Sequence, residues 1–389
     1  MSRSAGCSRW IWNWALEQER KAIDTTGNRI GRFPLDKELK NLKRQPGTAF
    51  LAEPSSWCLS QTLIDLDQAF ANNRAGTAGK PKFHRRGSDD SFRYPRDFKL
   101  AESRNLVFLP KIGWVKYINT RRIAGRPRSI TVSRQAGDWY MSVLAEEDIP
   151  DPVHPHPESA VGIDLGVKLF AALSDGTVLE SLRLHERFEA KLAKLQRKLA
   201  RKEKRSRNRD RLVVRIQRLY RRIANVRKDF LHKASTMICK NHATVVVEDL
   251  KIKNMTKSAK GTLEEPGRNV KAKAGMNRSI LSEGWGMFVH MLRYKLERLG
   301  GRLIIVPPQY TSQACSRCGF VDAGNRRTQA KFRCLKCGLE LNADFNAALN
   351  ILAAGLAVTA CGAGTPAVKQ EPPGRGVSNG MPLSGIPVL

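Results

Sequence analysis

Two pairs of cysteines constrain the fold of this chain more than any other feature of its sequence. Cys315 and Cys318 form one C-x-x-C pair, Cys334 and Cys337 form another, and fifteen residues separate the pairs. Four thiolates at this spacing are typical of a tetrahedral zinc site, and a redox pair or free thiols is the weaker interpretation. Because the four cysteines leave no coordination position open, we predict a structural rather than a catalytic zinc ion. Basic side chains nearby can offset the charge of the thiolates: Arg317, Arg326, Arg327, Lys331, Arg333 and Lys336.

The rest of the sequence suits a protein of a reducing compartment. The other four cysteines, Cys7, Cys58, Cys239 and Cys361, are scattered, which does not suit the disulfide framework of a secreted protein. The first residues lack the apolar segment and the cleavage site of a signal peptide. The most apolar stretch, residues 347–364, is interrupted by polar residues and dominated by small ones. We therefore expect a helix and a tail there, not a membrane span, and a cytoplasmic protein.

A large excess of positive charge indicates a polyanionic partner. The 389 residues include 68 Lys and Arg but 36 Asp and Glu, a net charge of +32. Each cation that neutralises a phosphate releases a counterion, which favours nucleic acid, whereas a membrane surface would require an anchor that the sequence lacks. Residues 183–233 contain twenty basic and five acidic residues, and residues 151–182 contain one basic and five acidic residues. The sequence thus predicts a basic nucleic-acid surface and a short acidic island.

Hydrophobic periodicity divides the first half of the chain into helical and extended regions. Residues 8–75 have helical spacing, with apolar positions at Trp10, Ile11, Trp14, Leu59, Leu63, Leu66 and Phe70. Residues 76–100 are rich in Gly, Arg and Lys with Phe83, Phe92, Tyr94 and Phe98 between them, which makes them a candidate nucleic-acid surface. Residues 105–148 contain four short apolar runs separated by turns, at residues 106–109, 115–118, 129–132 and 139–144, and predict a small barrel-like β module.

Two further segments precede the apolar strands of the second half. Residues 148–157 contain four prolines and two histidines, and their proline content favours a linker over a metal site at His154 and His156. Residues 183–233 have apolar residues at alternating spacings of three and four, which predicts two helices paired through a coiled-coil-like seam. The very basic residues 201–209 between them are either a solvated turn or a phosphate contact, and the charge of the hairpin favours phosphate.

Three acidic residues lie where they could converge. Asp164 is in an apolar strand, Glu248 ends a buried strand at residues 244–247, and Asp344 begins an amphipathic helix. Singly, each has an ordinary interpretation: a turn aspartate, a strand-to-loop acid, and a helix N-cap or first-turn acid. Asp249, next to Glu248, could be a cap or an indirect ligand. Together, the three acids could hold two Mg²⁺ or Mn²⁺ ions that activate water and stabilise the leaving oxygen of a phosphodiester.

These motifs together resemble the TnpB (transposon OrfB) family, the compact RNA-guided nucleases of bacterial insertion sequences, which are related to type V CRISPR effectors. The resemblance runs from about Cys7 to Glu371. Its most specific parts are residues 161–176, 245–255, 265–270, 307–313 and 342–350, together with the cysteine pairs. Relatives usually have a short strand and a helix before the block that begins here near Cys7. We therefore expect the β module to lack a strand, with weaker RNA binding or activity.

The resemblance implies a domain for each part of the chain. It implies an α/β fold with a ribonuclease H-like, RuvC-type nuclease domain at residues 151–310, which includes the basic hairpin at 183–233. The implied acidic triad is Asp164, Glu248 and Asp344. The zinc ribbon would occupy residues 311–339, and the third RuvC motif with its helix residues 340–361. A helical recognition lobe at 1–75 and a wedge-like module at 76–150 would precede them, and the Gly- and Pro-rich residues 362–389 are predicted to be disordered.

The residues and the resemblance together predict a divalent-metal-dependent DNA endonuclease that acts in the bacterial cytoplasm, at the nucleoid, and the resemblance alone implies that it is guided by RNA. Its partners would be a guide RNA and a double-stranded DNA target. Its cofactors would be Mg²⁺ (or Mn²⁺) at the acidic triad and structural Zn²⁺ at the cysteines. Two alternatives remain: a guide-bound protein that binds DNA without cutting it, such as a repressor, and a transposase that transfers DNA strands. The presence of all three acids favours the endonuclease over the repressor.

Overall fold

The computed structural model describes residues 1–87, 90–262, 264–328 and 330–360, and these form two compact units. The first unit ends at Asp148 and the second begins at Ile149. Each unit is described by itself. The predicted disordered tail at 362–389 and Cys361 lie outside the described residues.

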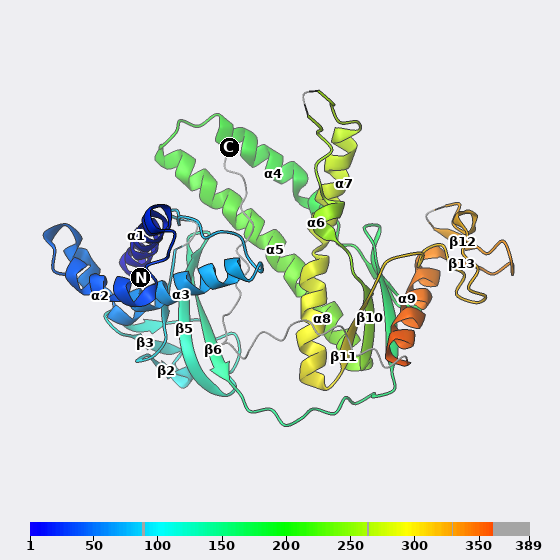
Figure 1. Cartoon of the computed structure of the whole chain (residues 1–389), viewed down its shortest axis with the longest axis horizontal. Coiled ribbons are helices and arrows are strands. Elements are labelled where there is room, and N and C mark those ends of the chain that lie inside the picture. Colours follow the sequence, from blue (N-terminus) through cyan, green and yellow to red (C-terminus); the bar gives the residue numbers. More distant parts are fainter. Residues whose placement is uncertain (88–89, 263, 329, 361–389) are drawn as a thin grey trace. The chain divides into compact units, whose positions relative to one another are not determined.

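The first unit begins with the predicted helices, shown in blue in Figure 1. They are α1 (Ser2–Thr26), α2 (Arg32–Leu42) and α3 (Ser56–Arg74), with a 3₁₀ turn, η1 (Pro46–Ala52), between α2 and α3. Leu59, Leu63 and Leu66 of α3 are all buried, so the spacing of four and three residues does mark the inner face of a helix. They pack against buried residues of the other two helices, among them Ile11 and Leu39.

Six strands complete the first unit. The strands β1 (Ser91–Tyr94), β5 (Arg126–Gln135) and β6 (Asp138–Glu146) form one antiparallel sheet. The strands β2 (Lys99–Ala101), β3 (Leu106–Leu109) and β4 (Gly113–Lys116) form another, and a short 3₁₀ turn, η2 (Glu102–Arg104), joins β2 to β3. Their inner faces share one apolar core. The described strands are therefore two three-stranded sheets and not one closed barrel.

The strands β1 and β2 correct the interpretation of residues 76–100. Phe92 and Tyr94 of β1 lie in the core, where they are 3% and 0% exposed, and Phe98 packs against the same core. These three aromatic residues therefore stabilise the β module and are not available to nucleic acid, whereas Phe83 is 46% exposed and remains a candidate. The alternation of Phe92 and Tyr94 with the polar Ser91 and Arg93 is the strand pattern that the high charge of this segment obscures.

A five-stranded sheet organises the second unit. Its strands are β7 (Ala160–Leu165), β8 (Leu169–Leu173), β9 (Val178–Glu180), β10 (Thr244–Glu248) and β11 (Arg302–Val306), in the order β11-β10-β7-β8-β9. Neighbours among β7, β8 and β9 are antiparallel, whereas β10 is parallel to both β7 and β11. The long connections between parallel strands contain helices, so this unit has the predicted α/β fold.

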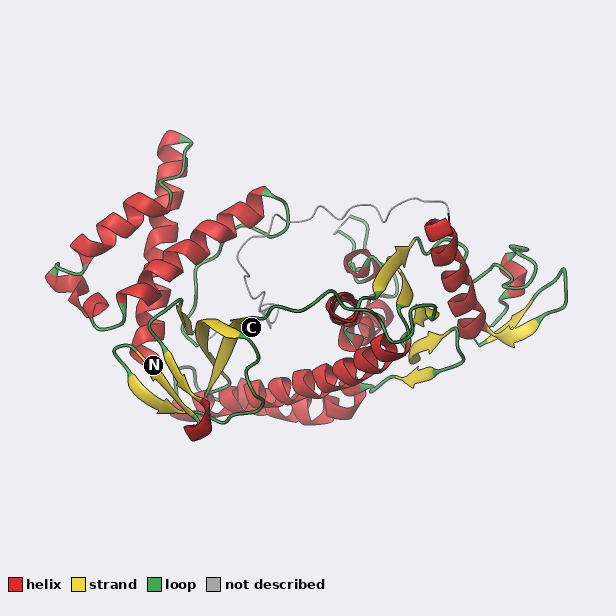
Figure 2. Ribbon diagram, turned by 90° about the horizontal axis from the view of Figure 1, so that it is seen from below, coloured by secondary structure: helices red, strands yellow, loops and turns green. Residues whose placement is uncertain are grey.

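Helices cover both faces of this sheet. On one face, Val161, Ile163, Val245 and Val247 pack against α5 (Arg207–Asn241), α7 (Val270–Glu283) and α8 (Trp285–Leu299). On the other face, Val246, Ile304 and Val306 pack against Ile351 of α9 (Ala343–Ala360). Burial on both faces explains why the sequence of β10 is a continuous apolar run rather than an alternating one. Figure 2 shows these helices around the yellow strands.

The predicted helical hairpin is α4 (Leu184–Ala200) and α5, joined by the basic turn. The side chain of Ser206 caps α5 by accepting a hydrogen bond from the Arg209 N–H at 3.2 Å. The helix continues eight residues beyond the predicted end at residue 233, because Leu231, Ala234 and Ile238 are core residues of the sheet. The basic first half of α5 and its buried second half are thus one element.

The proline-rich residues 149–157 have no helix or strand, as a linker should, but His154 is not a solvated linker residue. It is 3% exposed, and its Nε2 lies 2.7 Å from the Cys239 carbonyl oxygen. Its Nδ1 accepts the His156 N–H at 3.0 Å, so the ring carries its proton on Nε2 and donates it to Cys239. Both ring nitrogens are used, which excludes the metal role considered for this histidine. Within the described residues, no helix is long and apolar enough to span a membrane.

Candidate functional site

Two of the predicted acids lie side by side at the ends of neighbouring parallel strands. Val247 of β10 pairs with Ile163 of β7, so the next residue of each strand, Glu248 and Asp164, comes next in the register. Side chains alternate along a strand, and the pairs 161/163 and 245/247 face α5 and α8. Asp164 and Glu248 therefore face the opposite side of the sheet, the side that α9 covers.

Glycines bring the third acid to this side of the sheet. A Cβ on Gly162 of β7 would lie 2.2 Å from the Ala348 carbonyl oxygen, and a Cβ on Gly355 of α9 would lie 2.5 Å from the Val246 methyl carbons. Only glycine permits α9 to approach β7 and β10 this closely. Asp344 is in the first turn of α9. The side chain of Asn342 caps this helix by accepting the backbone N–H groups of Asp344 and Phe345, so Asp344 is not the capping residue.

The three carboxylates share one electrostatic environment. Burial, together with the charges of Glu248 and Asp344, raises the pKa of Asp164 to about 7, and Arg326 opposes this shift. Burial likewise raises the pKa of Glu248, against a hydrogen bond from Thr311. A proton held at neutral pH marks a surplus of negative charge that a cation would relieve. The donor set, three carboxylates on rigid elements, fits hard divalent ions such as Mg²⁺.

Two contacts fix these acids, and neither was predicted from the sequence. The Thr311 hydroxyl donates to Glu248 Oε1 at 2.5 Å, and Arg326 Nη2 lies 3.0 Å from Asp344 Oδ1. Arg326 was expected to offset the charge of the cysteines, but it forms an ion pair with one of the acids. Asp249 points elsewhere, because its carboxylate pairs with Lys251 at 2.5 Å.

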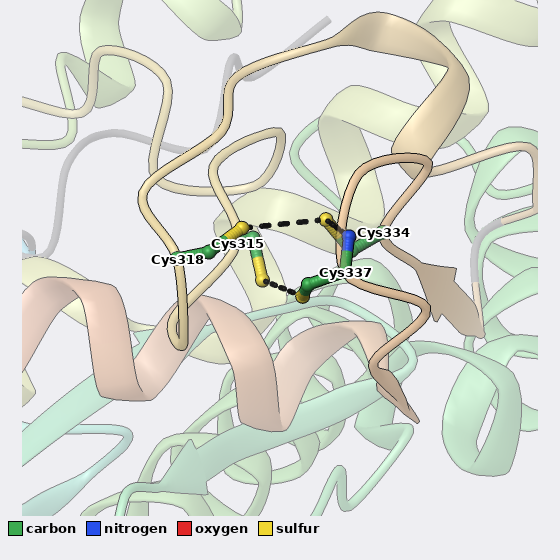
Figure 3. Close-up of side chains that lie close together, drawn as sticks. All are labelled: Cys315, Cys318, Cys334 and Cys337. Carbon is green, nitrogen blue, oxygen red and sulfur yellow. Dashed lines mark hydrogen bonds between the residues drawn. The ribbon is translucent and has the colours of Figure 1, made fainter.

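The four cysteines converge as predicted. Their sulfur atoms all lie within 4.8 Å of one another, and the Cys315–Cys337 and Cys318–Cys334 pairs are each 3.6 Å apart (Figure 3). Ligands about 2.3 Å from a tetrahedral zinc ion lie about 3.8 Å apart, so the geometry fits such an ion. Among the described residues, this is the one group of three or more His, Cys, Asp or Glu side chains that converges so tightly. The three acids are not drawn together to this extent.

Each cysteine pair is followed by a tight turn that holds its backbone in place. Gly319 and Gly338 follow the two pairs with positive φ, and their N–H groups bond to the carbonyls of Cys315 and Cys334 at 2.9 and 3.0 Å. Burial opposes ionisation of Cys334, but hydrogen bonds from the Cys337 and Lys336 backbone N–H groups outweigh it and lower its pKa, whereas burial and the neighbouring sulfurs raise the pKa of Cys337, so the cluster favours one thiolate first. A thiol that ionises readily is a suitable metal ligand.

Three asparagines hold the cysteine loops to each other and to α9. Asn325 is 1% exposed, and it donates to the Gln313 and Phe320 carbonyls and accepts the Leu335 N–H. Asn346 and Asn350 of α9 donate to the Ala314 carbonyl at 2.8 and 2.7 Å. The spacing of four residues between Asn346 and Asn350, on one face of a helix, is the sequence signal that could have identified them. A short β12 (Lys331–Arg333) and β13 (Glu340–Asn342) pair connects the second loop to α9.

Three protein-family models match parts of this chain. Residues 141–259 match a family described as "Probable transposase", residues 285–351 match "Cas12f1-like, TNB domain", and residues 1–28 match "Helix-turn-helix domain". The first match contains Asp164 and Glu248, and the second contains the four cysteines and Asp344.

Similar proteins extend over nearly the whole chain. The "Putative RNA-guided DNA endonuclease InsQ" of Escherichia coli (strain K12) is 46% identical over 376 residues, which cover 96% of this chain and 93% of that protein. A "Putative RNA-guided DNA endonuclease" of Streptomyces pristinaespiralis is 33% identical over 391 residues, which cover 96% and 92%. A chain in the cryo-EM structure of a Cas12f1–sgRNA–target DNA complex is 19% identical with a TM-score of 0.36, and the match covers 90% of this chain and 93% of that one. On the strength of the two near-full-length relatives and the matching family model, this chain belongs to the TnpB (transposon OrfB) family.

Proposed function

We propose that this protein is an RNA-guided DNA endonuclease that hydrolyses phosphodiester bonds with divalent metal ions held by Asp164, Glu248 and Asp344. The observation that carries the proposal is that Asp164 and Glu248 lie on adjacent strands and that the charges of Glu248 and Asp344 both act on Asp164. Burial, together with the charges of Glu248 and Asp344, keeps a proton on Asp164 near neutral pH, which is the condition that bound cations would relieve. Two near-full-length relatives are named RNA-guided DNA endonucleases, which supports the same activity here.

The sheet topology supports a ribonuclease H-like, RuvC-type domain. Three antiparallel strands followed by two parallel ones, in the order β9-β8-β7-β10-β11, is the arrangement that this class of domain would require. Asp164 lies on β7, Glu248 lies at the end of β10, and Asp344 lies on α9, which covers one face of the sheet. The fold thus positions all three on rigid elements rather than on loops.

Each residue of the site has a task that its position permits. Mg²⁺ or Mn²⁺, when bound, would supply activated water and stabilise the leaving oxygen. Asp164 and Glu248 would hold the ions on adjacent strands, and Asp344 would complete the ligand set from α9. Thr311 orients Glu248 through its hydroxyl, and Arg326 holds Asp344. The four cysteines would bind a structural Zn²⁺ that secures the loop carrying Arg326.

The basic surface of the hairpin would hold nucleic acid. The exposed residues Arg207, Arg211, Arg215, Arg218 and Arg222 follow one another at spacings of four, four, three and four along α5. Such spacing places them in one stripe on the helix, about a quarter turn away from the buried Leu212 and Leu219. A stripe of this kind suits the backbone of a duplex formed by guide RNA and target DNA, whose sequence would be read by base pairing alone.

Loss of single acids provides the direct test. Protein is purified with its bound RNA, the RNA is sequenced, and plasmids that carry the matching target are incubated with Mg²⁺. We expect Asp164→Asn and Glu248→Gln to reduce cleavage at least about a hundredfold while RNA and DNA binding stay intact. The matched control is Asp249→Asn, because this neighbouring carboxylate pairs with Lys251 and not with the site. Cleavage by both site variants at the wild-type rate would refute the assignment.

The same preparation separates the two alternatives. A repressor would bind the target and leave it uncut with any divalent ion. A strand-transfer enzyme would join a donor end to the target, whereas the proposed endonuclease yields broken targets alone. A preparation without any discrete bound RNA would argue against guidance even if DNA were cut.

A further inference from the structure

One of the four converging cysteines is far more accessible than the others. Cys315 and Cys334 are 1% and 2% exposed, and Cys337 is half-buried, whereas Cys318 is exposed. The Cys318 sulfur lies 3.6 Å from that of Cys334 (Figure 3). A small oxidant in solution therefore meets Cys318 first and finds a buried thiol directly beside it.

The other cysteines of the described residues are poorly suited to oxidation. Cys7, Cys58 and Cys239 are 5%, 1% and 0% exposed. Burial raises the pKa of the Cys58 and Cys239 thiols to about 12, and burial with the charge of Glu53 raises the pKa of Cys7. Peroxides react with thiolates and not with thiols, so these three cysteines should stay reduced. A cysteine that holds zinc is already a thiolate, so Cys318 combines an ionised sulfur with exposure.

A short path of contacts joins the cysteines to a proposed catalytic acid. Leu335, which follows Cys334, donates its backbone N–H to Asn325 Oδ1 at 2.9 Å. The residue after Asn325 is Arg326, whose Nη2 lies 3.0 Å from Asp344 Oδ1. One hydrogen bond and one ion pair therefore connect the second cysteine loop to Asp344.

A zinc ion and a disulfide would hold the two cysteine loops differently. Sulfur ligands of a tetrahedral zinc ion lie about 3.8 Å apart, whereas a disulfide draws two sulfurs into covalent contact. A disulfide between Cys318 and Cys334 also removes two of the four ligands, so the ion is released. The second loop then shifts toward the first, and the Leu335–Asn325 hydrogen bond transmits this shift to Arg326.

We propose that Cys318 and Cys334 are an oxidation site, at which a peroxide forms a disulfide, releases zinc and thereby stops DNA cleavage. Cys318 is the residue that the peroxide attacks, and Cys334 is the residue that completes the disulfide. The loss of cleavage follows because Arg326 no longer holds Asp344. This last consequence rests on the proposed function, whereas the disulfide and the release of zinc do not.

The chemistry consumes one peroxide and needs no other oxidant. The Cys318 thiolate attacks one peroxide oxygen, the O–O bond breaks, and the other oxygen leaves as hydroxide, which gives a sulfenic acid. The Cys334 thiolate then attacks the Cys318 sulfur, the S–S bond forms, the S–O bond breaks, and a second hydroxide leaves. The two sulfurs together lose the two electrons that reduce the peroxide. A reducing dithiol and Zn²⁺ restore the original state.

The first measurement follows zinc and sulfur without DNA. Full-length protein with Cys361→Ser, which removes the cysteine outside the described residues, is reduced, loaded with Zn²⁺ and treated with increasing hydrogen peroxide. We expect released Zn²⁺, measured with a coloured chelator, to rise together with a crosslink between Cys318 and Cys334. Mass spectrometry of unreduced peptides identifies the crosslink. Trypsin separates the four cysteines into four peptides, because it cuts after Arg317, Arg333 and Lys336.

Two histidine variants test which cysteine reacts first. Cys318→His removes the exposed thiol but keeps a zinc ligand, because three cysteines and one histidine also form a structural zinc site. We expect this variant to retain zinc at peroxide concentrations that release it from the parent protein. The matched control is Cys337→His in the other cysteine pair, which should release zinc as the parent does. If Cys318→His binds no zinc before oxidation, the crosslink in the parent carries the test.

The last measurement connects oxidation to the acids. The peroxide-treated parent should cut a matching target about ten- to a hundredfold more slowly, because Asp344 loses its partner. Dithiothreitol with Zn²⁺ should restore the rate, and RNA affinity should stay that of the reduced protein. Cys318→His, compared with its own untreated rate, should resist the same treatment.

The outcomes separate this inference from the proposed function. Zinc retained after oxidation, a crosslink between other cysteines, or a sulfinic acid at Cys318 without a crosslink would overturn the oxidation site. Undiminished cleavage by crosslinked, zinc-free protein would overturn its connection to Asp344. Protein that forms the crosslink and releases zinc, but never cuts DNA even when reduced, would contradict the proposed function alone. Protein that cuts DNA equally before and after peroxide, without a crosslink, would contradict this inference alone.

Discussion

At the scale of single residues, Asp164 carries the clearest physical signal. Its pKa is raised to about 7, against about 3.9 in an unfolded chain. Between these values the metal-free folded protein keeps a proton that the unfolded chain releases, so this group stabilises the fold fully below about pH 4. The contribution falls as the pH rises and is lost near pH 7. A bound cation would reverse the preference, because it favours the ionised carboxylate.

The expected result is a pH-dependent difference between wild type and Asp164→Asn. Without divalent ions, the wild-type unfolding temperature should fall relative to that of the variant as the pH rises from 5 to 8. Added Mg²⁺ should raise the wild-type value more at pH 8 than at pH 6 and should have less effect on the variant. Thermal unfolding followed by circular dichroism measures both. Parallel curves for the two proteins would mean that Asp164 titrates normally.

Arg326 provides a second prediction at this scale. Arg326→Ala removes the partner of Asp344 and a charge that lowers the pKa of Asp164, so we expect cleavage to fall about ten- to a hundredfold. Arg326→Lys should restore part of the rate, since lysine keeps the charge but not the planar geometry. The exposed neighbour Arg327 serves as control through Arg327→Ala. Zinc content is measured in each variant, and a loss of zinc would show that the loop and not the ion pair had failed.

The sequence alone identified those site residues that belong to a recognisable motif. The cysteine pairs were predicted because ligand spacing is local, and the three acids because their motifs resemble those of a known family. Thr311 and Arg326 were missed because their contacts cross 63 and 18 residues. Nothing local marks an arginine beside two cysteine pairs as the partner of a distant acid. The catalytic role of the acids stays a prediction.

At the scale of elements, the contact between β7 and α9 decides whether the site exists. We expect Gly162→Ala to destabilise the protein by about 1–3 kcal/mol, because backbone atoms of α9 cannot move aside as a flexible side chain would. Cleavage should fall as Asp344 moves from the sheet. Gly275→Ala in α7 is the control: nothing lies within 4 Å of its added Cβ, so its effect should be small or stabilising. Chemical denaturation measures both, and equal stability of the two variants would contradict the close approach.

Long elements with strong periodicity were predictable, and short or composite ones were not. The hairpin and α3 follow from helical spacing that extends over several turns. The strands β1 and β2 have four and three residues, too few for periodicity to outweigh a charged composition. His154 was assigned to a linker because the residues around it are rich in proline. Its hydrogen bond to the Cys239 carbonyl joins residues that are 85 positions apart in the sequence. Tertiary contacts of this range decide what local patterns leave open.

At the scale of the whole molecule, the position of the basic residues matters more than the net charge of +32. Twenty of the basic residues lie between residues 183 and 233, and five of them form the exposed stripe on one face of α5. Neutralised phosphates release counterions, so the logarithm of affinity falls by about 0.9 per contact for each unit of the logarithm of salt concentration. The salt dependence therefore counts the cations that touch the backbone and ignores those that are only solvated.

This count gives the last prediction. In the triple variant Arg211→Gln/Arg215→Gln/Arg222→Gln, the slope of log affinity against log salt concentration should become less negative by about two to three. Binding should weaken alike for all duplex sequences. The control removes equal charge from the partner helix, with Lys191→Gln/Lys194→Gln/Lys198→Gln at three exposed positions of α4. Fluorescence anisotropy with an RNA–DNA duplex between 50 and 300 mM salt measures both. Because both triples remove the same charge from one hairpin, an equal change in slope would mean that bulk charge, and not the geometry of the stripe, attracts the nucleic acid.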